Sequence, residues 1–328
     1  MSPRVTAIHP PSAIEGGRIT IEGTGFPVDG PSLPEVRIGD APARLVHASP
    51  TQLSAIVPAG LEAGRAPVRV AADETACIDI AAPFATDLHQ VDNPLFDRAG
   101  NLYVTYSGTR GEQAPVSIFR IRPDGTREPF SSGIVNPTSM AADAQGRIYV
   151  SSRFEGTVYR VSPDGTTEVF AHHLGVACGL AFSREGALFV GDRSGTIFKV
   201  GAGGRAATFA TLPASVAAFH LAFGPDDTLF VTGPTLSSRD ELYRIAPDGT
   251  VTTQDARFGR PQGLAFDPGG TLHVVEALAG LSGLYRLPAD GPPQLVLTGP
   301  GLVGVAFNAA GHMVVASNDT AYRLSRST

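Results

Sequence analysis

The stretch GLAFDPGGTLHVVE, residues 263–276, contains two short apolar runs separated by Asp-Pro-Gly-Gly. Short apolar runs on either side of a Gly/Pro turn are typical of a β-hairpin. The pattern recurs along the chain, and with DPGGTLHV (267–274) it occurs six times at intervals of 40 to 46 residues. The other copies are DRAGNLYV (97–104), DAQGRIYV (143–150), SREGALFV (183–190), GPDDTLFV (224–231) and NAAGHMVV (308–315).

A second hairpin follows each of the first five copies. It begins with a run such as TVYRV (157–161) and in most copies turns at an Asp-Gly phrase such as SPDGT (162–166). Asp-Gly suits this turn because glycine adopts a positive φ at little steric cost. Units of four short antiparallel strands, repeated every 40 to 46 residues, are typical of propeller blades. The sequence therefore predicts an all-β chain with a six-bladed propeller over residues 82–328.

The sixth copy lacks a fourth strand before the chain ends. The segment APFATDLHQ (82–90) resembles the fourth strands TREPF (126–130) and TTEVF (166–170). We therefore expect a strand from about 82–88 to close the ring by pairing with TAYRL (320–324), because an open ring leaves unpaired strand edges. A plain linker is the alternative.

Residues 1–81 contain no blade motif. Apolar residues alternate in short runs between Pro and Gly turns, which predicts a small antiparallel sandwich. The phrases PRVTAIHPPSAIEGGRITIEGTGF (3–26) and EVRIGDAPARLVHASPTQLSAIVP (35–58) resemble the IPT/TIG immunoglobulin-like domain. The resemblance implies a spacer, docking or interaction module.

Composition excludes several classes of function. The chain has 328 residues, a net charge of −6 and 17% charged residues, and no run of Lys or Arg, so nucleic-acid binding is not expected. No signal peptide is visible, no apolar run is long enough to cross a membrane, and the chain is expected to be soluble. The spacing of Cys77 and Cys178 matches no zinc motif or disulfide framework, although a single bridge stays open.

Topology indicates where a site would lie. In a four-stranded unit the first and third turns lie on one face, and the connections between strands two and three and between units lie on the other. The first set is short and uniform here, whereas the second is long and varied, as in TYSGTRGEQAP (105–115). We expect function on this long-loop face, near the start of each first strand.

The repeats resemble NHL repeats and the six-bladed senescence-marker/gluconolactonase superfamily, on phrases such as GLAFDPGGTLHVVE and VYRVSPDGT. The resemblance implies Ca²⁺ or another divalent cation in the central channel, where it polarises a lactone carbonyl or activates water. On the matching phrases, Asp92 and Asn136 are the candidate metal ligands. The chain departs from the pattern at two other ligand phrases, where Cys178 and Gln262 stand.

His220 at the start of a first strand and Glu276 at the end of a second strand are the candidate catalytic acid/base groups. The phrase around Glu276 also resembles one in the streptogramin-lyase propellers. The candidate ligand-binding residues are Asn93, Arg153, Asp192, Gln262 and Asn318. For Asp192 and Asn318 the alternative is a hydrogen bond to backbone amides, and for Arg153 a surface ion pair.

These observations predict a propeller that binds a small polar ligand in its central channel. The resemblance extends this to metal-dependent hydrolysis of a lactone or ester, although the altered ligand phrases leave open whether the protein is an enzyme. The alternative is a non-catalytic NHL/TIG scaffold that docks a protein partner on the long-loop face.

Overall fold

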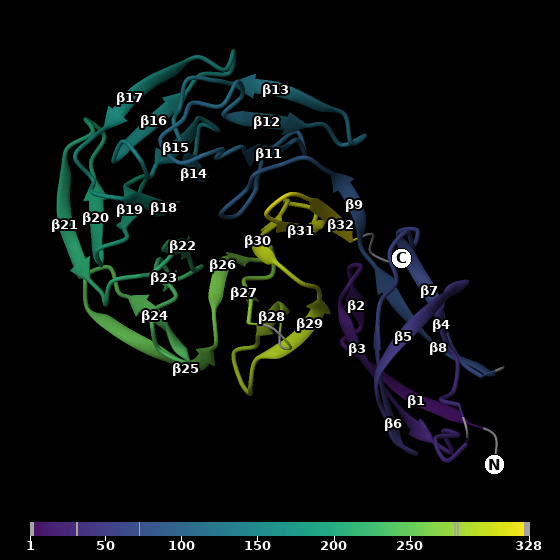
Figure 1. Ribbon diagram of the computed structural model, residues 1–328. Helices are drawn as coiled ribbons and strands as arrows, with labels where there is room; N and C mark the ends of the chain where they lie inside the picture. Colours follow the sequence, from purple (N-terminus) through teal and green to yellow (C-terminus); the bar gives the residue numbers. More distant parts are fainter. Residues whose placement is uncertain (1–2, 31, 72, 279, 281, 325–328) are drawn as a thin grey trace.

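The computed structural model describes residues 3–30, 32–71, 73–278, 280 and 282–324. Strands and turns make up this part of the chain, and it contains no helix, so no helix of membrane-spanning length is found within it. Figure 1 shows two bodies, a ring of sheets around a central space and a smaller domain at its side. The all-β prediction is therefore confirmed.

The smaller domain is a two-layered sandwich. Its strands are β1 (Arg4–His9), β2 (Ser12–Ala13), β3 (Arg18–Thr24), β4 (Val36–Ile38), β5 (Ala41–Ala48), β6 (Gln52–Ile56), β7 (Gly64–Val70) and β8 (Asp73–Ile80). In β3 every second residue is buried, because side chains of a strand alternate between its two faces. Ile19 and Ile21 of this strand pack in one apolar core with Val36, Val68 and Ile78 of the other layer.

The ring is built from consecutive four-stranded antiparallel units. The first three are β10 (Leu95–Phe96), β11 (Leu102–Thr105), β12 (Ile118–Ile121) and β13 (Arg127–Ser131); β14 (Pro137–Ala142), β15 (Ile148–Ser152), β16 (Thr157–Val161) and β17 (Thr167–Ala171); and β18 (Ala177–Phe182), β19 (Leu188–Asp192), β20 (Thr196–Val200) and β21 (Ala206–Thr211). The fourth is β22 (His220–Phe223), β23 (Leu229–Thr232), β24 (Asp240–Ile245) and β25 (Val251–Phe258). In Figure 1 the first strand of each unit lies toward the centre and the last at the rim.

The repeated Asp-Gly turns have a common local cause. The carboxylates of Asp124, Asp164 and Asp248 each accept a hydrogen bond from the backbone amide two residues later. Gly165 follows Asp164 with φ +86°, and a Cβ there would lie 1.9 Å from the carbonyl oxygen of Phe130 in the preceding unit. Glycine is therefore required both by the turn and by the close approach of the preceding unit.

The prediction of six blades is wrong in its count, because the described residues form five separate four-stranded sheets and the remaining repeat belongs to a larger sheet. That repeat comprises β26 (Pro261–Phe266), β27 (Leu272–Glu276), β28 (Gly283–Leu287) and β29 (Gln294–Thr298). The edge strand β29 pairs in parallel with β2, which also pairs with β8, so this unit forms one end of a twelve-stranded sheet. Repeat counting misses this because the edge of a blade is open to any strand that reaches it.

The last sheet joins the two ends of the ring. It consists of β30 (Leu302–Phe307), β31 (Met313–Ser317), β32 (Ala321–Leu324) and β9 (Ala82–Ala85), with β9 antiparallel to β32. The fourth strand of this sheet thus comes from the chain segment before the first unit. Because strands from both ends share one sheet, the first and last units are held next to each other.

Candidate functional site

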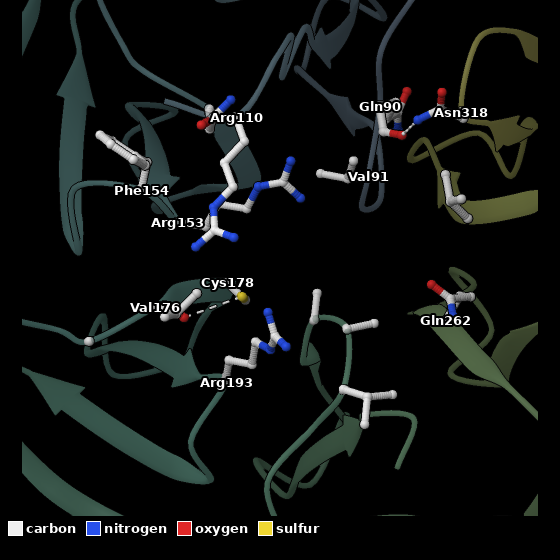
Figure 2. Close-up of a pocket in the computed structure, with 16 residues that line it drawn as sticks. Gln90, Val91, Arg110, Arg153, Phe154, Val176, Cys178, Arg193, Gln262 and Asn318 are labelled. Atoms are coloured by element: carbon white, nitrogen blue, oxygen red, sulfur yellow. Dashed lines mark hydrogen bonds between the residues drawn. The ribbon is translucent and has the colours of Figure 1, made fainter. Parts of the chain in front are cut away.

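A cavity of about 570 Å³ lies at the centre of the ring. Figure 2 shows the sixteen residues that line it. They are Gln90, Val91, Arg110, Asn136, Arg153, Phe154, Gly175, Val176, Cys178, Arg193, Val216, Ala217, Ala218, Gln262, Val303 and Asn318. All belong to the starts of first strands, to the segments just before them, or to connections between second and third strands. The cavity therefore opens on the long-loop face.

Three arginines dominate one side of the cavity. Arg110 follows β11, and Arg153 and Arg193 follow β15 and β19 at equivalent places in neighbouring units. Figure 2 shows the three side chains extending from this side toward the centre. Burial is the largest cause that lowers the pKa of Arg153, and the positive charges of Arg110 and Arg193 lower it further, against an opposing effect of Cys178. The three guanidinium groups therefore influence one another electrostatically.

The other side of the cavity carries neutral amides. Asn318 donates from Nδ2 to the backbone oxygen of Gln90 at 2.8 Å, and Gln90 donates from Nε2 to the backbone oxygen of Asp92 at 2.7 Å. Gln90 is fully buried, and its Oε1 has no hydrogen-bond partner in the described part of the chain. Gln262 is 9% exposed, and in Figure 2 it lies opposite the arginines.

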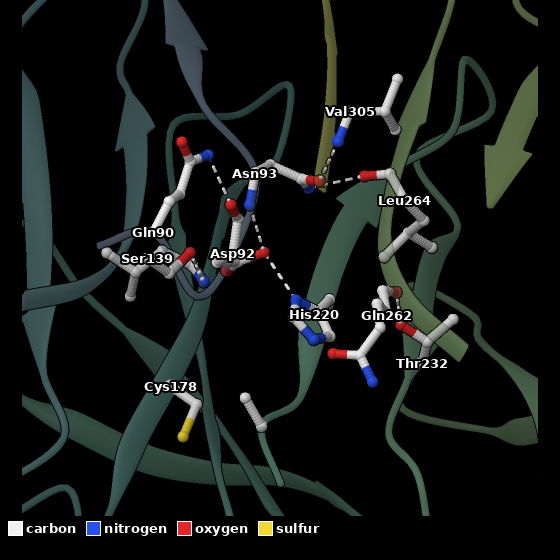
Figure 3. A network of polar contacts seen from close by, with 12 residues as sticks. Gln90, Asp92, Asn93, Ser139, Cys178, His220, Thr232, Gln262, Leu264 and Val305 are labelled. Carbon is white, nitrogen blue, oxygen red and sulfur yellow. Dashed lines mark hydrogen bonds and ion pairs between the residues drawn. The ribbon is translucent and has the colours of Figure 1, made fainter. Parts of the chain in front are cut away.

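Residues 90–93 make contacts that join units distant in sequence. Asp92 Oδ1 lies 2.6 Å from Nδ1 of His220, the first residue of β22, and also accepts a hydrogen bond from the backbone amide of Asn93 (Figure 3). Asn93 donates to the backbone oxygen of Leu264 at 2.9 Å and accepts from the amide of Val305 at 2.9 Å. The Nδ2 and Oδ1 atoms of the Asn93 side chain thus both hold units together, and Asn93, expected to bind a ligand, does not line the cavity.

Asn136 lines the cavity, but its side chain is used by the neighbouring loop. Its Nδ2 donates to the backbone oxygens of Ser107 and Thr109 at 2.6 and 2.8 Å, and its Oδ1 accepts from the amide of Gly111 at 2.7 Å. The residue therefore clamps the connection that carries Arg110. The sequence predicted a metal-ligand role, whereas this side chain already makes three hydrogen bonds to the loop and keeps one acceptor lone pair on Oδ1.

Glu276 and Asp192 do not line the cavity either, although the sequence placed both in the site. The carboxylate of Glu276 is 2% exposed and accepts hydrogen bonds from the backbone amides of Gly259, Arg260 and Leu278. Asp192 accepts from the amide of Val176 at 2.7 Å and from Ser194 Oγ. Both side chains therefore hold loops through hydrogen bonds to backbone amides. For Asp192 this is the alternative that the sequence left open, and for Glu276 it gives no support to a catalytic role.

The donor set does not fit a divalent cation. No group of three or more His, Cys, Asp or Glu side chains that could hold a metal ion occurs within the ranges that the structure describes. The side chain of Asp92 is paired with His220, and that of Asn136 is hydrogen-bonded to the loop that carries Arg110. The carboxylate of Glu276 accepts hydrogen bonds from backbone amides. A cation such as Ca²⁺ takes about six to eight oxygen ligands from carboxylates, carbonyl groups and waters. We therefore derive no step through a metal.

Cys178 lines the cavity but is poorly suited to nucleophilic attack. Burial is the main cause that raises the pKa of its thiol to about 12, and its Sγ donates to the backbone oxygen of Val176. The thiolate is the nucleophilic form of cysteine, and it is scarce at neutral pH with such a pKa.

Of the nine sequence-predicted site residues, the cavity lining includes Arg153, Gln262, Asn318 and Asn136, whereas Asp92, Asn93, Asp192, His220 and Glu276 lie outside it. The candidates named from the sequence did not include Arg110, Gln90 or Arg193. A usable signal was present for Arg193, because it stands forty residues after Arg153 in the equivalent connection of the next unit. Nothing comparable marks Arg110, whose connection is longer.

Comparisons with known proteins agree with this architecture. Residues 3–82 match the IPT/TIG domain family, and a comparison with curated proteins finds no match. An auxiliary nutrient binding protein from Bacteroides ovatus is similar over 100% of this chain and 99% of its own, with 12% identity and a TM-score of 0.58. A gluconolactonase from Xanthomonas campestris is similar over 74% of this chain and 89% of its own, with 19% identity and a TM-score of 0.59. A virginiamycin B lyase from Staphylococcus aureus covers 75% of this chain and 87% of its own, with 13% identity and a TM-score of 0.52. At these identities the likeness shows the fold, an IPT/TIG domain joined to a propeller.

Proposed function

We propose that this protein binds a small polar molecule in the central cavity of its propeller. The observation that carries the proposal is the cavity itself, about 570 Å³ in volume and lined by cationic, amide and apolar groups from around the ring. This volume lies within the range of pockets that enclose small organic ligands. The apolar lining residues, among them Val91, Phe154 and Val303, supply contact area, and the polar groups orient the ligand.

The similarity over the whole chain to a protein described as nutrient binding supports a binding role. The IPT/TIG domain then acts as a rigid mount, because β2 is paired with both β8 and β29. In this proposal the propeller supplies the binding site. The sandwich holds the propeller in a constant orientation relative to any partner that the IPT/TIG domain contacts.

Hydrolysis of a bound lactone or ester is the finer form of the proposal. The gluconolactonase likeness motivates it, and guanidinium groups in the cavity are suited to stabilise a developing oxyanion. A water molecule would also need a base, and none of the sixteen lining residues is Asp, Glu or His. Binding is therefore the function that the geometry supports better.

A protein-docking scaffold is the alternative. The large apolar side chains Phe154, Val176 and Val216 are 54%, 38% and 37% exposed, which would suit a protein partner. However, all three also line the cavity, so they serve equally as the apolar contact of a small ligand. The exposed side chains thus do not favour docking over ligand binding.

The test is a screen of the full chain by thermal shift, followed by calorimetry, with neutral sugars, lactones, amino acids and organic acids. A ligand of the cavity should raise the melting temperature of the wild type and bind weakly to Gln262→Leu, because the amide of Gln262 would no longer donate or accept. Gln294→Leu on the exposed edge of β29 is the matched control. If no compound stabilises the protein, or if both variants bind alike, the proposal is wrong. Lactones that bind should also be tested for turnover with and without EDTA.

A further inference from the structure

The arginines of the cavity differ from those on the outer strands. On the outer strands Arg120, Arg160 and Arg257 each pair with a glutamate, Glu128, Glu168 and Glu241 respectively. In contrast, no carboxylate among the described residues forms an ion pair with Arg110, Arg153 or Arg193. Positive charges brought together without counter-charges repel one another, so the arrangement is unfavourable until an anion enters.

The cavity has the opposite sign to the protein. The chain carries a net charge of −6, yet the lining contains three arginines and no Asp or Glu. A concave site with charges of one sign focuses the electric field and attracts small ions of the other sign. An anion is therefore drawn to the cavity, although the whole protein would repel it weakly.

The loops that carry the arginines are held in place. Asn136 clamps the connection of Arg110 through Gly111, Ser107 and Thr109. The connection of Arg193 is held because Arg193 Nε donates to the backbone oxygen of Ser215 at 3.3 Å. Hydrogen-bond donors that are already held in position lose less conformational freedom when a ligand binds, so this site is preorganised for binding.

The polar groups opposite the arginines indicate which groups the ligand carries besides its negative charges. Gln262 and Asn318 lie across the cavity in Figure 2. The side-chain amides of both residues carry donor and acceptor atoms. A ligand that also carries a hydroxyl or amine would suit this side of the cavity.

We propose that Arg110, Arg153 and Arg193 together bind a small organic anion with at least two negative charges on phosphate or carboxylate oxygens. This inference rests on the proposed function and names its ligand class. The planar guanidinium group pairs with both kinds of oxyanion through two parallel hydrogen bonds. The neutral part of the ligand faces Gln262 and Asn318.

The experiment is calorimetric titration of the full chain with citrate, glucose 6-phosphate, inorganic phosphate and glucose, at about 50 mM and about 300 mM NaCl. We expect citrate or glucose 6-phosphate to bind, glucose to bind much more weakly, and the affinity to fall at the higher salt concentration. Preference between citrate and glucose 6-phosphate distinguishes a polycarboxylate from a phosphorylated ligand. Binding of inorganic phosphate alone, with both organic anions inert, would overturn the inference of an organic ligand.

Arg153→Gln and Arg193→Gln should each weaken binding by about tenfold, because a charge-assisted hydrogen bond is lost. Arg153→Lys should recover part of the affinity, since it keeps the charge without the planar fork. Arg205→Gln, at an exposed position outside the cavity, is the matched control and should change affinity by less than about twofold. A melting temperature of the free variants no lower than that of the wild type would exclude misfolding.

The failure of this inference is distinguishable from failure of the proposed function. If neutral sugars or lactones bind as tightly as the anions and the arginine variants bind like wild type, the cavity binds ligands but the anion class is wrong. If no probe binds and the wider screen is also negative, both proposals are wrong.

Discussion

Oδ1 of Asp92 and Nδ1 of His220 lie 2.6 Å apart, although 128 residues separate them in the chain. Both side chains are almost completely buried, with 2% and 0% exposure. Nε2 of His220 has no hydrogen-bond partner in the described ranges. Asp92 is therefore the single hydrogen-bond partner of the imidazole within those ranges. The pair joins the segment before the first unit to the first strand of the fourth, and it braces the ring from inside.

Replacement of one member of this pair should destabilise the protein strongly. His220→Ala leaves Asp92 without this partner in a buried site, which typically costs about 3–5 kcal/mol. Chemical denaturation should show this loss, and Asp92→Ala/His220→Ala should lose less than the sum of the single variants. Additivity of the two changes within about 0.5 kcal/mol would contradict the coupling.

Glu276→Ala should lower stability because three backbone amides lose their acceptor. Hydrogen bonds to a charged group contribute enough that we expect a loss of about 2–3 kcal/mol in the free energy of unfolding. Glu241→Ala, in a partly exposed pair with Arg257, is the control and should cost less than about 1 kcal/mol. A Glu276→Ala variant with wild-type stability but no ligand binding would instead place this carboxylate in the site.

The two cysteines should react very differently with a thiol reagent. Cys77 is exposed, whereas Cys178 is 1% exposed and burial raises the pKa of its thiol to about 12. At about pH 8 one equivalent of the reagent should react rapidly with the folded protein, at Cys77. A second equivalent should react only after unfolding exposes Cys178, since the thiolate is the reactive form. Cys77→Ser should abolish the rapid phase. Rapid labelling in that variant would show that Cys178 is accessible and activated.

Acidification should destabilise the protein through His273. Burial, the main cause, lowers the pKa of this imidazole below its usual value of 6.5. Below that value the unfolded chain binds a proton that the folded protein does not, so the free energy of unfolding decreases as pH falls. His273→Gln should flatten the stability curve between about pH 7 and about pH 5.5, and the exposed His47→Gln should not. Parallel curves for His273→Gln and the wild type would refute this origin.

The sandwich and the propeller should unfold as one cooperative body. Ile14 is 1% exposed and packs against Val275, Leu284 and Leu297 of the propeller, next to the paired strand β2. Ile14→Ala should cost about 2–5 kcal/mol in the single transition of the full chain. Leu33→Ala, whose side chain is 58% exposed, should change stability by no more than about 0.5 kcal/mol. Two separate transitions in the wild type would show that the domains are independent.

The sequence alone was sufficient for the all-β class, the repeating hairpins and the IPT/TIG domain. Each depends on residues close together in the chain: an apolar period of two, a glycine with positive φ such as Gly165, or an aspartate such as Asp164 that bonds an amide two residues later. Such local rules hold wherever the unit lies. They also indicated the long-loop face, because strand order in an antiparallel unit determines which connections share a face.

Only the tertiary structure decided what the polar side chains at the strand ends do. Asn93 and Glu276 stand where a site residue would stand, yet one bonds Val305 far along the chain and the other bonds a loop from its own unit. Arg110, Arg153 and Arg193 meet in one cavity because the ring curves, and β2 joins β29 because a blade edge was open to it. Contacts of this kind form because closure of the ring brings residues together that are far apart in the sequence, and local sequence patterns do not determine which residues meet.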